Sequence, residues 1–79
     1  MNMVYNSNSV VGIYEDIVNA KSDLLKLLKD SGYMYDIDLD YDDYLLLKCC
    51  GKKGIEFPED NILCFEIVYK SIGINNIMV

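Results

Sequence analysis

The chain contains no Arg, His, Trp, Gln or Thr, and it has only one proline and three cysteines. Without histidine, a Ser or Cys nucleophile lacks the commonest general base, and a zinc ion lacks its commonest nitrogen ligand. A glycine-rich phosphate-binding loop is also absent. We therefore expect a protein that is not an enzyme and that holds no metal or cofactor.

The cysteines, Cys49, Cys50 and Cys64, are odd in number and two are adjacent, which makes a poor disulfide framework. A reducing setting and buried thiols are expected instead. No apolar run approaches the 18 residues of a membrane span, and residues 1–9 lack the features of a secretion signal. The sequence thus predicts a cytoplasmic protein that does not contact membranes.

The 79 residues predict one small domain, 1–79, and 52% hydrophobic with 25% charged residues is typical of a globular chain. Abundant Ile, Asn, Lys, Tyr and Asp have A/T-rich codons. This composition indicates an A/T-rich genome, such as that of a virus, a phage or another mobile element, or a low-GC bacterium.

The stretch Tyr33–Tyr41 alternates between apolar and acidic residues, which is typical of a half-buried strand. We expect one set of alternate residues to face the core and the other set to display a row of carboxylates. The core set is Tyr33, Tyr35, Ile37, Leu39 and Tyr41, and the row is Asp36, Asp38, Asp40 and Asp42.

The negative charge is concentrated in the same region. Asp30 to Asp43 holds six acids and no base, while the rest of the chain holds seven acids and seven lysines, so this segment accounts for the net charge of −6. A protein of this kind repels nucleic acid and anionic membranes and attracts basic surfaces.

Apolar residues from Val10 to Asp30 follow helical spacing, and Gly32 stands where a helix would end. We expect an amphipathic helix whose regular part begins near Tyr14. Strands are expected at Tyr44–Cys50, in a central position, and at Ile62–Tyr69. Shorter strands are expected at 3–5, 55–57 and 74–79.

These elements predict an α+β fold, with one amphipathic helix packed on a small antiparallel sheet. The alternative is an all-α three-helix domain, in which Asp40 caps a helix that ends at Gly51 and Pro58 begins another. The segment Gly54-Ile55-Glu56-Phe57-Pro58-Glu59-Asp60 resembles the one that follows the second helix of acyl carrier proteins. That resemblance implies the all-α fold, but the triplet that contains the modified serine in that family corresponds here to Asp38-Leu39-Asp40, which has no serine.

Asp36-x-Asp38-x-Asp40 has the spacing that begins a calcium loop. The sixth and twelfth positions of such a loop require Gly and Glu, and here they hold Tyr41 and Leu47. Carboxylates spaced about 6.8 Å apart along a strand cannot converge on one ion. We therefore expect no metal site there.

The composition and charge favour a non-enzymatic inhibitor that occupies a basic site on a larger protein, for example a nucleic-acid-binding site, as a nucleic-acid mimic. Direct binding of nucleic acid is not expected, because the tyrosines are surrounded by acids. The alternatives are a homodimeric structural or regulatory module and a degenerate carrier-like domain. The predicted partner-binding residues are Asp36, Asp38, Asp40, Asp42, Asp43, Tyr35, Tyr41 and Tyr44.

Overall fold

The computed structural model describes residues 1–71 and contains one α-helix and six strands. The elements in chain order are β1 (Asn2–Asn6), β2 (Ser9–Tyr14), α1 (Ile17–Asp30), β3 (Tyr33–Tyr41), β4 (Tyr44–Lys52), β5 (Ile55–Glu56), the short 3-10 helix η1 (Glu59–Asn61) and β6 (Leu63–Tyr69). All strand pairs are antiparallel. The α+β prediction is confirmed, and the all-α alternative is wrong.

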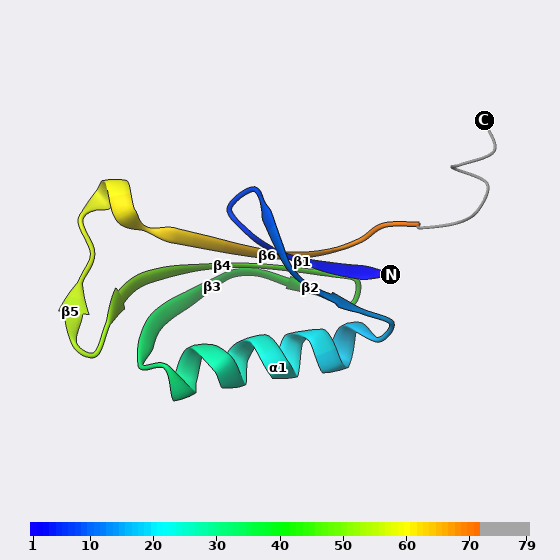
Figure 1. Ribbon diagram of the computed structural model, residues 1–79, viewed down its shortest axis with the longest axis horizontal. Helices are drawn as coiled ribbons and strands as arrows, with labels where there is room; N and C mark the ends of the chain where they lie inside the picture. The colour runs from blue at the N-terminus through cyan, green and yellow to red at the C-terminus, as the bar shows by residue number, and fades with distance from the viewer. Residues whose placement is uncertain (72–79) are drawn as a thin grey trace.

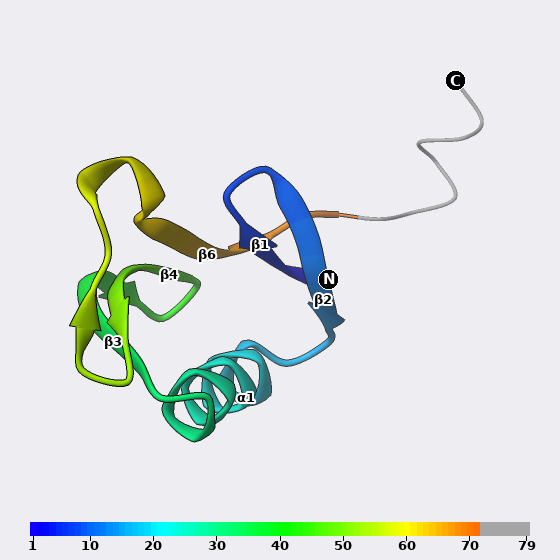
Figure 2. The same cartoon turned by 60° about the vertical axis from the view of Figure 1, so that its left-hand side comes forward.

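The strand order in the sheet is β2-β1-β6-β4-β3, and β5 pairs with the end of β4. Strand β4 lies between β3 and β6, as its run of apolar residues predicted. The sheet curls around α1, so that both edge strands, β2 and β3, approach the helix (Figures 1 and 2). One face of the sheet therefore packs on α1, and the other, called the open face below, turns away from it.

The core lies between α1 and the concave face of the sheet. Helical spacing brings Ala20, Leu24 and Leu28 onto one side of α1, and strand alternation buries every second residue of β4. Burial of one such leucine contributes about 1.5–3 kcal/mol. The buried apolar residues are Val4, Ala20, Leu24, Leu28, Leu45, Leu47, Cys49, Phe65 and Ile67.

The predicted helix start is wrong, because Ser9–Tyr14 forms strand β2 and pairs with β1. The β-branched residues of this segment suit a strand, and Gly12 lies opposite Val4 in the ladder. Helix α1 begins after Asp16, whose side chain accepts a hydrogen bond of 2.8 Å from the Val18 N–H. This is an N-cap, and it satisfies a donor that the helix cannot satisfy internally.

The other chain reversals agree with the sequence. Gly32 follows α1 with φ +78°, and its N–H donates to the Lys29 carbonyl at 3.0 Å. Asp42 and Asp43 form the turn between β3 and β4. The expected strand 74–79 lies outside the described residues. Within residues 1–71, no helix has the length and apolar character needed to cross a membrane.

The segment that resembles acyl carrier proteins does not follow a helix. Residues 54–60 include β5 and the first part of η1, and the triplet at 38–40 lies within a strand. The structural basis of the carrier-like alternative is therefore contradicted.

Candidate functional site

Strand β3 carries the predicted site, and its pairing with β4 contains two irregularities. The register shifts between Met34 and Tyr35 and again between Ile37 and Leu39. At the second shift, Asp38 is an extra residue with no partner of its own in the ladder. Such a β-bulge reverses the facing of every side chain that follows it.

The predicted row of carboxylates on one face is therefore wrong. Asp36 pairs with Lys48, which lies on the open face, whereas Asp40 pairs with Leu45, which is buried on the helix side. Asp38 occupies the bulge between them, and Asp42 and Asp43 lie in the turn. The five aspartates are all exposed, but they point in several directions around one end of the sheet edge.

The alternate apolar residues of β3 are also divided between the two faces of the sheet. Tyr33 and Tyr35 pack against the core, as predicted. Ile37 lies on the helix side but is 44% exposed, and Leu39 and Tyr41 lie on the open face with 39% and 57% exposed. Only the first part of β3 contributes to the core, because the bulge turns the second part over.

Two lysines from neighbouring elements contact the aspartates. Lys21 of α1 lies 2.7 Å from Asp40, and Lys48 of β4 lies 3.5 Å from Asp38. Exposed pairs of this kind contribute about 0–1 kcal/mol each. Among residues 1–71, the structure gives no ion pair to the other three aspartates, Asp36, Asp42 and Asp43. These three carboxylates are available to a partner.

The predicted tyrosines do not share one surface either. Tyr41 and Tyr44 are cross-strand partners on the open face, whereas Tyr35 is paired with buried Cys49 on the helix side. The Tyr44 hydroxyl donates a hydrogen bond to the Glu66 carboxylate. This bond, with partial burial, raises the pKa of Tyr44 to about 12. Glu66 was not predicted as a site residue, although it is the only charged residue in β6.

The open face carries two rows of mostly apolar residues that cross the five long strands. Each row follows the cross-strand pairs from β2 to β3, and Glu66 is the one charged side chain within them. The first row is Ile13, Met3, Val68, Tyr44 and Tyr41; the second is Val10, Tyr5, Glu66, Leu46 and Leu39. Among residues 1–71, only the turn between β1 and β2 rises over part of this face. The rows were not predicted, because they are formed by residues distant in the sequence.

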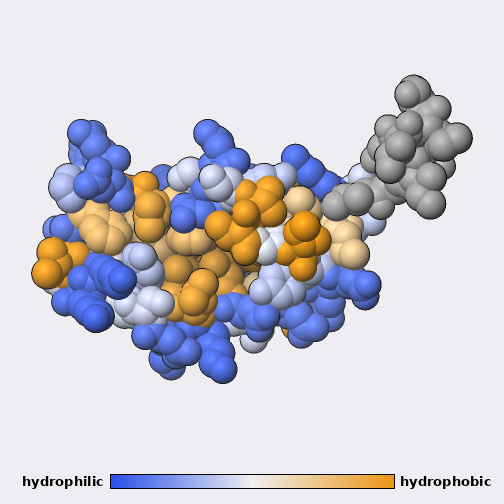
Figure 3. All heavy atoms as spheres, viewed as in Figure 1, coloured by the Kyte–Doolittle hydropathy of each residue, from blue (hydrophilic) through white to orange (hydrophobic). Residues whose placement is uncertain are grey.

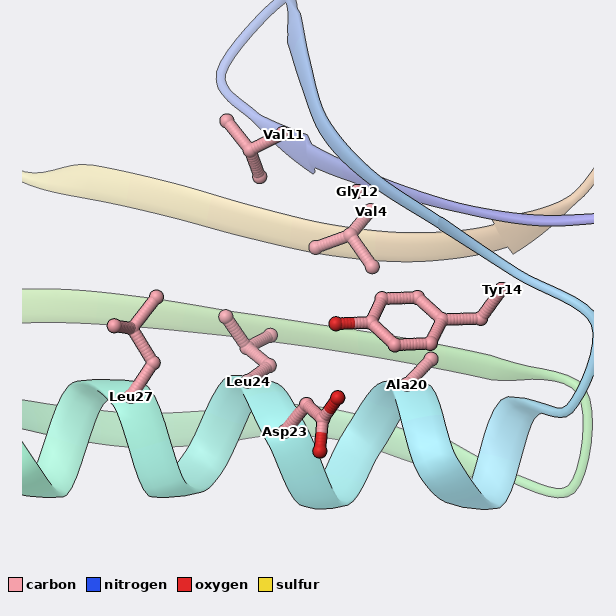
Figure 4. Close-up of a pocket in the computed structure, with 8 residues that line it drawn as sticks. All are labelled: Val4, Val11, Gly12, Tyr14, Ala20, Asp23, Leu24 and Leu27. Carbon is pink, nitrogen blue, oxygen red and sulfur yellow. The ribbon is translucent and has the colours of Figure 1, made fainter.

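A small apolar pocket lies on another side, between β2 and α1. Exposed apolar side chains gather over β2 in Figure 3, and Figure 4 shows Tyr14 and Asp23 at the pocket, above and on the helix. Partial burial and the Asp23 carboxylate raise the pKa of Tyr14. The pocket volume is about 70 Å³, well below the roughly 300–1,000 Å³ of typical small-molecule sites.

All three cysteines are free thiols; Cys49 is buried in the core, whereas Cys50 and Cys64 are only half-buried, so the expectation of buried thiols holds for Cys49 alone. Burial raises the pKa of the Cys49 thiol to about 11, which keeps it protonated and unreactive at neutral pH. In the part of the chain that the structure describes, no group of three Cys, Asp or Glu side chains could hold a metal ion.

Comparisons with protein-family models, with curated proteins and with solved structures give no match.

Proposed function

We propose that this chain is a non-catalytic binding protein that recognises a basic surface on a larger protein. The observation that carries the proposal is the acidic hairpin, which we define as Asp36, Asp38, Asp40, Asp42 and Asp43 on β3 and its turn. All five are exposed and no lysine interrupts them in the sequence. Lys21 and Lys48 contact only Asp40 and Asp38, so the hairpin keeps an excess of negative charge, which attracts basic proteins and increases their rate of association.

The bulge supports a particular mode of binding. Because the carboxylates surround the strand edge, they suit a concave basic site into which the hairpin inserts. A straight row that imitates a nucleic-acid backbone is not present. Inhibition would follow from occupation of the basic site, and any competition with nucleic acid would be steric and electrostatic.

The test is affinity capture of partners from bacterial lysate at about 50 mM and about 500 mM salt, which differ strongly in electrostatic screening. The bait is the wild type or the triple variant Asp36→Asn, Asp42→Asn, Asp43→Asn, which neutralises the three unpaired aspartates. We expect partners at low salt that are weakened at high salt and lost in the variant.

A matched control is available at the opposite end of the sheet. The triple variant Glu56→Gln, Glu59→Gln, Asp60→Asn also removes three negative charges, in this case from β5 and η1, where the side chains are exposed as well. We expect this control to retain the partners. Equal losses in the two variants would mean that net charge, and not the acidic hairpin, determines binding, and would refute the proposal.

A further inference from the structure

The open face of the sheet has the composition of an interface centre. Leu46 and Val68 are half-buried on this face, and Ile13, Leu39 and Tyr41 are 55%, 39% and 57% exposed. Large contiguous apolar patches are uncommon on monomeric proteins and mark interaction sites. The two rows, each crossing five strands spaced about 4.8 Å apart, bring nine apolar or aromatic residues together on this face, with Glu66 among them.

The charges around this patch are unevenly placed. On the β3 side lie the acidic hairpin and Lys48, whereas β1 and β2 contain no charged side chain. Lys70 follows the middle strand β6, and its Nζ lies 5.1 Å from the centre of the Tyr5 ring. The apolar patch therefore has an acidic border at β3 and an uncharged border at β2.

The patch also contains a hollow. The turn between β1 and β2 rises above the sheet on the side away from α1 (Figure 1). With β6 it borders an open hollow of about 350 Å³, lined by Tyr5, Ser7, Asn8, Glu66, Val68 and Lys70. A partner side chain could enter this hollow, so the open face is able to fix the position of a partner as well as attract it.

We propose that the open face docks on a protein surface whose apolar centre is bordered on one side by lysines or arginines. The apolar rows would cover the centre, and the acidic hairpin would meet the basic border, which sets a single orientation. A second copy of the chain fits less well, because face-to-face packing buries Glu66 from both copies and each copy carries a net charge of −6. The inference rests on the proposed function and adds the apolar half of the interface.

The test uses a phage-displayed library of random peptides as the probe, selected on the wild-type protein. We expect the selected peptides to combine a cluster of apolar residues with Lys or Arg at one end. The variant Leu46→Lys should weaken their binding at least tenfold, because it places a charge in the centre of the patch. Leu39→Lys is a second variant. Because Leu39 is more exposed than Leu46, this substitution should disturb the folded structure less.

Val18→Lys is the matched control, because Val18 is an apolar residue of α1 that is 67% exposed and belongs to another surface. Circular dichroism of each variant verifies that the sheet is retained. Peptides that bind all three variants equally would overturn the inference, as would peptides without a basic end. Light scattering could instead show a dimer that Leu39→Lys dissociates. That result would also overturn the inference, because a second copy of the chain would then cover the open face.

The two proposals fail in different ways. If peptide binding depends on Asp36, Asp42 and Asp43 but not on Leu46 or Leu39, the acidic hairpin binds alone and the open-face inference is wrong. If binding depends on the leucines but not on the aspartates, the partner does not need a basic border. Both the proposed function and the open-face inference would then be refuted.

Discussion

The division of β4 into a core face and an open face can be tested with two neighbouring leucines. Leu47 is fully buried between β3, β6 and the helix, whereas Leu46 is half-buried on the open face. Leu47→Ala and Leu46→Ala remove the same atoms from the same strand. The difference between them therefore reports which way each side chain points.

The expected magnitudes differ severalfold. Truncation of a fully buried leucine costs about 2–5 kcal/mol, because the lost burial is accompanied by a cavity. A chain of this length has a total free energy of unfolding of about 4–12 kcal/mol, so Leu47→Ala removes a large part of it. Leu46→Ala creates no internal cavity, because Leu46 lies on the open face, and it should lower the free energy of unfolding by about 1 kcal/mol or less.

Urea denaturation followed by circular dichroism measures both losses. With a slope of about 1 kcal/mol per molar urea, Leu47→Ala should lower the midpoint by roughly 3 M and Leu46→Ala by roughly 1 M or less. Equal shifts, or a larger shift for Leu46→Ala, would refute the assignment of faces. A Leu46→Ala loss that increases with protein concentration would show that the open face is covered by a second copy.

Three further predictions concern single contacts. Tyr44→Phe should lower the free energy of unfolding by about 1 kcal/mol, because the hydrogen bond to Glu66 is lost. Since the pKa of Tyr44 in the folded protein is raised to about 12, the difference in stability between wild type and variant should be complete below pH 10 and disappear as the pH rises through 12. Urea midpoints at several pH values measure it. Asp16→Ala should destabilise α1 by about 1 kcal/mol while Asp16→Asn retains the cap, as seen by thermal melting. Gly51→Ala should cost about 1–3 kcal/mol in urea denaturation, since its Cβ would lie 2.5 Å from the Ile55 carbonyl oxygen; a loss below 0.5 kcal/mol would contradict this contact.

The sequence was informative where the signal is local. Alternation predicted strand β3, the apolar run predicted the central position of β4, and Gly32 predicted the end of α1, because backbone conformation at each place depends on adjacent residues. The same reasoning failed at Ser9–Tyr14. Ile13 and Ile17 have helical spacing but belong to different elements, since pairing with β1 satisfies the backbone of the first segment.

The faces of β3 could not be predicted for a related reason. A bulge is created by the mismatch between two paired strands, and nothing at Asp38 marks it in the sequence, because no glycine or proline is present. Likewise, Glu66 receives its hydrogen bond from Tyr44, 22 residues away. The period of a strand predicts that its side chains alternate, but which side chain faces the core depends on the partner strand.

The two edges of the sheet help to explain why β3 is acidic. Charged residues on an edge strand often prevent aggregation, and this explanation would account for the aspartates without any partner. Yet β2 is also an edge strand, it has no charged residue, and both edges contact the same helix (Figure 2). Because the helix contacts both edges, protection of an edge strand does not by itself explain why only β3 and its turn carry aspartates. The asymmetry is what a surface selected for a basic partner would produce, and the paired Asn and Gln variants distinguish that origin from simple protection.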